Sequence, residues 1–167
     1  IGMATAPALY RKLNYKVPDD FEPVGLINEA PSVLIGNRAL SANNFDDLRK
    51  WMATKGSDVS LANAGLGSAS HLCGLMIQSA LKVKVTSVPY KGTAPAMNDL
   101  LGGQVDLMCE QATNAVPQIE GNKVKTFAQT GQYRLTLPSL KNVPTLAEAG
   151  VPNFNVNSSG WKSAASS

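Results

Sequence analysis

The stretch that decides the fold of this chain reads Ala62-Asn63-Ala64-Gly65-Leu66-Gly67-Ser68-Ala69-Ser70-His71. The apolar pattern predicts a strand over residues 58–64 and a helix over residues 71–81, so a turn rich in glycine and serine joins the two. The first turn of a helix has N–H donors without partners and carries partial positive charge. Glycine lets a ligand approach the backbone closely, and serine hydroxyls add donors. The stretch therefore predicts a cradle for an anion.

The same stretch also fits other interpretations. A plain strand-to-helix turn, with Ser68 or Ser70 capping the helix, fits the same residues. The spacing Gly65-x-Gly67-x-x-Ser70 is close to a dinucleotide fingerprint, but the next strand ends at residues 88–91 without the acidic residue that would bind ribose. The chain has no Gly-Lys-Ser/Thr motif, which excludes a P-loop.

A hydrolase built on Ser70 and His71 is disfavoured. Adjacent side chains leave a helix about 100° apart and do not face each other. The Gly-x-Ser-x-Gly elbow is absent, and His71 is the only histidine of the chain. We therefore predict no catalytic residue. His71 is predicted to donate a hydrogen bond to a ligand or to a neighbouring loop, and its alternative role is that of an ordinary polar residue in the first helical turn.

Outward from this stretch, short apolar runs alternate with amphipathic segments. The further predicted elements are helices over residues 45–54, 93–101, 116–120 and 145–149, and strands over residues 84–90, 105–109, 124–130 and 154–156. Residues 1–23 predict a partial helix followed by an extended arm. Strands and helices that alternate at these spacings predict an α/β lobe with a mostly parallel sheet flanked by helices.

Two more strand ends bring polar groups to the predicted edge of the sheet. Residues 89–94 offer backbone donors, Thr93 as a helix cap, and Lys91 as a cation, although Lys91 also fits a solvated surface position. Residues 108–114 follow the third strand and are also polar. Asp106 lies at the opposite end of that strand, so we predict a structural role for it. Three polar, weakly charged loops favour reversible binding over catalysis.

Composition sets the outer limits of this interpretation. The 167 residues predict one domain, and 15 basic residues against 12 acidic ones give a net charge of +3 that is scattered along the chain. This pattern argues against nucleic acid as a partner. No stretch approaches the ~20 apolar residues of a membrane span. Cys73 and Cys109 are predicted to be buried free thiols, with a disulfide as the alternative. No metal site or other cofactor is predicted, and the start at Ile1 without a signal peptide predicts a processed product or a fragment.

Several runs of the sequence match a known family in order. They are Pro7-Ala8-Leu9-Tyr10-Arg11-Lys12-Leu13, Asp20-Phe21-Glu22-Pro23-Val24, Gly65-Leu66-Gly67-Ser68-Ala69-Ser70-His71-Leu72, Val88-Pro89-Tyr90-Lys91-Gly92-Thr93-Ala94-Pro95-Ala96, Asp99-Leu100-Leu101-Gly102-Gly103-Gln104-Val105-Asp106-Leu107 and Val143-Pro144-Thr145-Leu146-Ala147-Glu148-Ala149-Gly150. Over about residues 1–157 the chain resembles the Bug family, the periplasmic solute-binding proteins of the tripartite tricarboxylate transporters.

The resemblance implies a bilobed, periplasmic-binding-protein-like α/β receptor. Such a receptor is not an enzyme and needs no cofactor. It closes on a small mono-, di- or tricarboxylate in the bacterial periplasm and delivers it to the membrane components of the transporter. The ligand-binding residues it implies are Gly67, Ser68, Ala69, Ser70 and His71 in the first loop, Tyr90, Lys91, Gly92 and Thr93 in the second, and Thr5 and Ala6 in the segment that approaches from the first lobe.

The resemblance also implies that the first lobe is incomplete, because a typical member is nearly twice as long. The predicted parts are residues 1–30 as a remnant of the first lobe with a crossing segment, 31–130 as the second α/β lobe, 131–157 as a return crossing segment with a short helix and strand, and 158–167 as a frayed tail. Surface left open by the missing lobe would favour a dimer. The alternative is a truncated, binding-incompetent fragment with a structural or interaction role.

Overall fold

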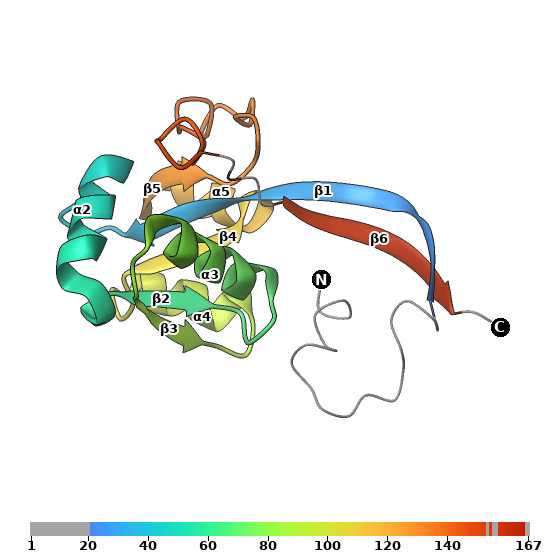
Figure 1. Ribbon diagram of the computed structural model, residues 1–167, viewed down its shortest axis with the longest axis horizontal. Helices are drawn as coiled ribbons and strands as arrows, with labels where there is room; N and C mark the ends of the chain where they lie inside the picture. Colours follow the sequence, from blue (N-terminus) through green and yellow to red (C-terminus); the bar gives the residue numbers. More distant parts are fainter. Residues whose placement is uncertain (1–20, 153, 155–156, 166–167) are drawn as a thin grey trace.

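A computed structural model describes residues 21–152, 154 and 157–165 of the chain (Figure 1). The elements are β1 (Phe21–Asn37), α2 (Phe45–Lys55), the short 3-10 turn Gly56–Asp58, β2 (Ser60–Asn63), α3 (Ala69–Leu81), β3 (Thr86–Pro89), α4 (Thr93–Leu101), β4 (Leu107–Gln111), α5 (Ala112–Glu120), β5 (Val124–Gln129) and β6 (Asn157–Ala165). The strands form a six-stranded sheet in the order β3-β2-β4-β1-β5, with β6 paired to β1 outside this path.

The sheet is mixed, and one strand runs against the others. β2 is parallel to β3 and to β4, whereas β1 is antiparallel to its neighbours β4 and β5. Four strands of the lobe therefore share one direction, which confirms the predicted α/β lobe with a mostly parallel sheet. Val33, Leu34 and Ile35 of β1 are all fully buried, as expected for a central strand covered on both faces.

Helices cover both faces of the sheet. Leu34 and Cys109 belong to the core cluster that contains α2 and α3, and Val33 and Met108 belong to the cluster that contains α4 and α5. Successive residues of a strand point to opposite faces, so β1 and β4 contribute to both clusters. No helix among the described residues is long and apolar enough to cross a membrane.

The long strand β1 continues beyond the lobe as part of a two-stranded ribbon. Its first part pairs antiparallel with β6, from Phe21 opposite Ala165 to Pro31 opposite Asn157, and the ribbon extends away from the lobe (Figure 1). Strand pairing uses backbone groups and requires no apolar pattern, which explains why the Ser- and Ala-rich residues 158–165 form a strand where a frayed tail was expected. The helix and arm predicted before residue 21 lie outside the described residues.

The helix predicted over residues 145–149, near the end of the lobe, is wrong. Thr145 forms an isolated β-bridge with Gln129, and residues 146–150 form hydrogen-bonded turns instead of a helix. Thr145 and Glu148 exchange side-chain and backbone hydrogen bonds as in a capping box, but the single α-turn that follows ends at Gly150. Five residues are too few to continue this start into a helix. Phe154 is not in a strand, and residues 155–156 lie outside the described part of the chain.

The two cysteines form a disulfide instead of the predicted free thiols. Cys73 on α3 is joined to Cys109 on β4, with the two Cα atoms 6.1 Å apart. Both side chains are fully buried. The pairing arises because α3 packs directly over β4, a tertiary contact that the spacing of two cysteines in the sequence cannot reveal. α3 is therefore fastened covalently to the middle of the sheet.

Candidate functional site

The three polar loops that the sequence singled out meet at one edge of the sheet. They follow β2, β3 and β4 and lead into α3, α4 and α5. β2 lies between β3 and β4 and is parallel to both, so the three strands end at the same edge (Figure 1). The edge therefore collects three helix N-termini, where ligands of open α/β sheets bind.

The N-terminus of α3 is organised by two serines. Ser68 is the N-cap, and its hydroxyl oxygen accepts the N–H of His71 at 3.2 Å. Ser70 lies 3.0 Å from Ser68, oxygen to oxygen, and its hydroxyl oxygen accepts the N–H of Ala64 at 2.9 Å. Ser70 is buried and ties the turn to the end of β2, whereas Ser68 is half-buried. The backbone N–H groups of Ala69 and Ser70 have no acceptor within the helix.

His71 is fixed by the loop in front of it. Its Nδ1 accepts the N–H of Gly67 at 3.1 Å. An imidazole nitrogen that accepts a hydrogen bond carries no proton, so the proton of the neutral ring is on Nε2. His71 was predicted to donate a hydrogen bond to a ligand or to a neighbouring loop, whereas the bond seen is one that it accepts from Gly67 in its own loop. The half-buried ring keeps Nε2–H as its remaining donor.

Two glycines give this turn a shape that other residues would resist. Gly65 and Gly67 have φ values of +115° and +77°. A Cβ at residue 65 would lie 3.2 Å from the carbonyl oxygen of Tyr90, in the second loop. The turn therefore brings the first and second loops into close backbone contact, which a side chain at position 65 would disturb.

The second loop is less open than the sequence suggested. The Tyr90 hydroxyl donates to Asp99 on α4 at 2.6 Å, and this bond, with burial and the nearby negative charge, raises the pKa of Tyr90. Lys91 is exposed. Gly92 is the N-cap of α4, so the prediction that Thr93 caps this helix is wrong. The Thr93 hydroxyl instead donates to Glu110 at 3.1 Å, because β4 ends directly beside the start of α4.

Glu110 belongs to the third polar loop, residues 108–114, but the sequence interpretation did not single it out. It is only 4% exposed, and its carboxylate also accepts the N–H of Gln111 at 2.9 Å and the side-chain amide of Asn114 at 3.1 Å. The available signal was an acidic residue at the end of an apolar strand, inside the third polar loop. An acidic side chain in that position has to find donors, and the starts of α4 and α5 provide them.

The structure does not place three other residues of the sequence analysis at this edge. Asp106 lies at the opposite edge of the sheet, and Thr5 and Ala6 are not among the described residues. Asp106 accepts both the backbone N–H and the hydroxyl of Ser60, at 2.8 and 2.7 Å, which confirms its structural role. Among the described residues, no group of three His, Cys, Asp or Glu side chains could hold a metal ion.

The family of the chain follows from comparison with known proteins. The model of the family described as "Tripartite tricarboxylate transporter family receptor" matches residues 1–161. The chain belongs to this family. A curated relative, the "UPF0065 protein in the TAR-I ttuE-ttuC' intergenic region" of Agrobacterium vitis, is 44% identical over 96% of the chain and 45% of its own length.

Solved structures of this receptor family share the fold. The periplasmic binding protein BugD is 45% identical and superposes with a TM-score of 0.89, over 98% of this chain and 54% of BugD. MatC from Rhodopseudomonas palustris, solved with bound malate, is 36% identical with a TM-score of 0.85, over 96% of this chain and 54% of MatC. These matches confirm the predicted family and the periplasmic-binding-protein-like fold. The chain spans about half the length of the proteins it matches.

Proposed function

We propose that this chain is the ligand-binding lobe of an extracytoplasmic receptor that binds a small organic acid and delivers it to the membrane components of a tripartite tricarboxylate transporter. The observation that carries the proposal is the N-terminus of α3, where a capping serine and uncommitted backbone N–H groups lie at the meeting point of three helix starts. Such a site attracts a carboxylate through hydrogen bonds and through the helix dipole. The malate bound to MatC supports an acid as the ligand.

The first loop supplies the donors for the carboxylate in this proposal. The backbone N–H groups of Ala69 and Ser70 point out of the helix start, the Ser68 hydroxyl lies beside them, and Nε2–H of His71 is a further donor. The positive φ of Gly67 shapes the turn that leaves room for the acid. Most of the binding energy then comes from backbone groups.

The second loop and the N-terminal segment complete the proposed site. Lys91, Gly92 and Thr93 face the acid from the start of α4, with Tyr90 holding that loop to α4 through Asp99. Thr5 and Ala6, which lie outside the described residues, are also proposed as ligand-binding residues. The buried Cys73–Cys109 disulfide supports a location in the periplasm, because disulfides persist in oxidising compartments.

The geometry does not favour a hydrolase. The Ser70 oxygen contacts Ser68 and Ala64, and Nδ1 of His71 is occupied by Gly67. A serine nucleophile needs a hydrogen bond to its base, and these two side chains are committed to other groups. Binding without chemistry is therefore the function that the site supports.

A calorimetric titration of the folded chain with acetate, succinate, malate, adipate and citrate tests the proposal. We expect micromolar binding of at least one acid, and we expect Ser68→Ala to weaken that binding by about 1–2 kcal/mol through loss of one donor. Folding is checked in the same samples by circular dichroism. A folded chain that ignores the whole panel would contradict the proposal and favour a binding-incompetent fragment with an interaction role.

A further inference from the structure

The edge of the sheet opposite the proposed acid-binding site gathers five loops. β1 ends at this edge, whereas β2, β3, β4 and β5 begin there. Asn37, the last residue of β1, pairs with Val124, the first residue of β5, and its N–H donates to the carbonyl oxygen of Asp106 at 2.9 Å. α2 lies at the same end of the lobe (Figure 1). The loops cover residues 38–44, 56–59, 82–85, 102–106 and 121–123.

Positive charge collects at this edge, although it is scattered along the sequence. The five loops and the ends of the elements that they join contain six cations against three carboxylates. The cations are Arg38, Lys55, Lys82, Lys84, Lys123 and Lys125, and the carboxylates are Asp58, Asp106 and Glu120. The remaining charges of α2 are two of each sign and leave this excess unchanged: Asp46, Asp47, Arg49 and Lys50. We call the five loops together with α2 the basic edge.

The cations of the basic edge are more available to a partner than its carboxylates. The exposed cations, none of which belongs to either ion pair among the described residues, are Arg38, Lys55, Lys82, Lys84 and Lys123. Two carboxylates already have partners: Asp106 accepts two hydrogen bonds from Ser60, and Asp46 lies 3.8 Å from the guanidinium of Arg49. The basic edge therefore presents more free positive charge than negative charge to solvent.

The loop that carries two of these lysines, residues 82–85, is held in place on both sides. The side-chain oxygen of Gln78 on α3 accepts the N–H of Val85 at 3.0 Å. On the other side, the hydroxyl of Thr86 donates to the carbonyl oxygen of Ser57 at 2.6 Å. These contacts tie the loop to α3 and to the turn after α2, so the backbone that carries the two lysines has a fixed place in the edge.

The same loop forms one wall of an open groove of about 330 Å³ beside the end of α2. Lys82 and Lys84 line the groove together with the apolar side chains of Met52, Leu81 and Val83. Cations next to apolar surface match the chemistry of an anionic lipid, in which a phosphate lies next to hydrocarbon. The groove therefore suits a lipid headgroup at the centre of the basic edge.

The type of cation indicates the type of partner. Five of the six cations in and beside the loops are lysines, and Arg38 is the exception. Lysine is a flexible, strongly hydrated point charge that is depleted from protein–protein interfaces, whereas arginine is favoured where a partner has to be matched in shape. Lysines spread over several loops suit a broad anionic membrane surface, to which each cation adds attraction.

We propose that the basic edge is a docking surface for a membrane that contains anionic phospholipids. The inference goes beyond the proposed function, because it needs neither a bound acid nor a protein partner. The starts of α3, α4 and α5 follow the opposite ends of the same strands. A lobe docked in this way keeps the proposed acid-binding edge on the side that faces away from the membrane.

Sedimentation with lipid vesicles tests the inference on the full chain. Vesicles of phosphatidylcholine alone are compared with vesicles of equal parts phosphatidylcholine and phosphatidylglycerol at low salt. We expect the partition coefficient to be at least about thirtyfold higher on the anionic vesicles, since each cation near such a surface adds a factor of about five. This preference should vanish at about 1 M salt, where the screening length is about 3 Å. Equal binding to both kinds of vesicle, or to neither, would overturn the inference.

Two charge reversals that give the same net charge separate the basic edge from the overall charge of the chain. Lys84→Glu reverses a cation of the basic edge. Lys141→Glu reverses an exposed lysine of the segment that follows the opposite end of β5. We expect Lys84→Glu to lower the partition coefficient on anionic vesicles at least about fivefold, and Lys141→Glu to lower it less than about twofold. Equal losses in the two variants would show that only net charge matters, and the inference would be wrong.

A milder variant keeps the test decisive if the reversal at Lys84 prevents folding. Lys82→Gln combined with Lys84→Gln removes two charges without adding repulsion, and circular dichroism checks that the chain is folded. The partition coefficient on anionic vesicles should fall at least about tenfold, with binding to phosphatidylcholine unchanged. An unchanged coefficient in the folded double variant would contradict the inference. Acid binding is measured separately by calorimetry, so failure of the inference and failure of the proposed function remain distinguishable.

Discussion

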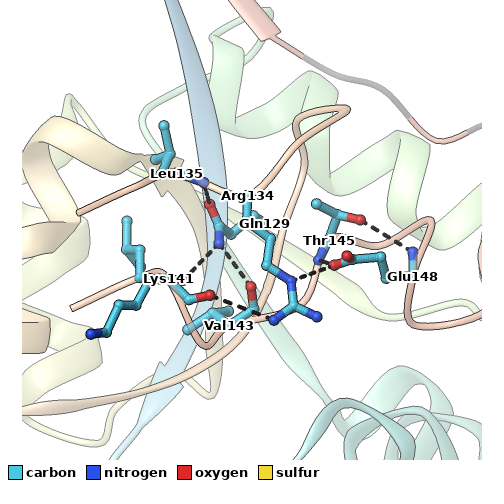
Figure 2. Close-up of polar contacts among 8 residues, drawn as sticks. Gln129, Arg134, Leu135, Lys141, Val143, Thr145 and Glu148 are labelled. Atoms are coloured by element: carbon cyan, nitrogen blue, oxygen red, sulfur yellow. Dashed lines mark hydrogen bonds and ion pairs between the residues drawn. The ribbon is translucent and has the colours of Figure 1, made fainter. Parts of the chain in front are cut away.

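Two irregular segments of this molecule follow strands, and they use their polar groups in opposite ways. The turn between β2 and α3 covers residues 64–68, and the longer segment covers residues 130–151 after β5. The first ends in a helix start whose N–H groups lack acceptors. In the second, the buried Gln129 side chain and the Arg134–Glu148 ion pair form hydrogen bonds with the polar groups of the segment (Figure 2). A turn keeps binding capacity only where its donors are not needed by the fold.

The longer segment is organised around Gln129, which is fully buried. Its amide nitrogen donates to the carbonyl oxygens of Leu140 and Val143 at 2.9 and 2.8 Å, and its amide oxygen accepts the N–H of Leu135 at 2.9 Å (Figure 2). One side chain thus satisfies three backbone groups of the segment that follows β5. Apolar side chains of both the segment and α3 pack into the core, but the segment is also tied to β5 by the polar contacts of Gln129, whereas α3 is tied to β4 by a disulfide.

Removing the disulfide that joins α3 to β4 should lower the stability of the chain more than any single substitution at Gln129, Gly67 or Arg134. Replacing both cysteines, Cys73→Ala with Cys109→Ala, removes a crosslink that closes a loop with a sequence separation of 36 residues. The chain-entropy relation then gives a loss of about 4 kcal/mol of unfolding free energy. Urea unfolding of the oxidised wild type and the variant measures it. Equal stabilities would show that packing alone holds α3 in place.

Gln129→Ala removes the side-chain hydrogen bonds that hold the longer segment. We expect it to lower the free energy of unfolding slightly less than loss of the disulfide does. Three backbone groups lose their partner, and we expect a loss of about 3 kcal/mol in urea unfolding. Acid binding at α3 should not change in the folded protein, because Gln129 holds only the other segment. Gln104→Ala is the control, since Gln104 is exposed and should alter stability by less than about 0.5 kcal/mol. Loss of acid binding in Gln129→Ala would show that the two segments are coupled.

Gly67→Val tests whether the turn before α3 is needed for acid binding as well as for stability. Position 67 has a φ of +77°, and Gly103, at the opposite edge, has a φ of +71° with open space around it. Valine in either position should cost about 1–2 kcal/mol of stability through backbone strain. Only Gly67→Val should also weaken acid binding, by at least about tenfold, because it blocks the approach to the donors. If Gly103→Val weakens binding as much, the effect is one of stability alone.

The smallest effect is expected at the exposed ion pair of the longer segment. The Glu148 carboxylate accepts from Arg134 at 2.7 Å and from the Thr145 backbone, which lowers the pKa of Glu148 (Figure 2). A pKa lowered by folding adds stability above the ordinary pKa of glutamate and loses it as the pH falls through the lowered value. NMR titration should show a higher pKa for Glu148 in Arg134→Met than in the wild type. Identical values would mean that the Thr145 contact alone sets this pKa.

Much of the fold was predictable because strands and helices alternate clearly. The predicted helix over residues 45–54 is confirmed as α2, and Asn44 caps it by accepting the N–H of Asp47. The serine-capped turn before α3 was predictable from local residues, because a glycine-rich turn before a helix is encoded by its own sequence. The Cys73–Cys109 disulfide and the role of Glu110 were missed, because both depend on α3 and α4 packing beside β4. Contacts between elements distant in the chain leave no periodic signal.

β1 has a mechanical consequence, because one continuous strand of 17 residues serves both the ribbon and the centre of the sheet. Its first part pairs with β6, and its last part lies between β4 and β5. A twisting force on the ribbon therefore acts on β1 within the sheet. There β1 pairs with β4, and its Val33 lies opposite Glu110. If β1 bends near Pro31, where its pairing partner changes from β6 to β4, the force is absorbed there. If β1 stays straight, the distances between the starts of α3, α4 and α5 have to change. The stiffness of a few residues of β1 thus sets how far a movement outside the lobe reaches the edge where the acid is proposed to bind.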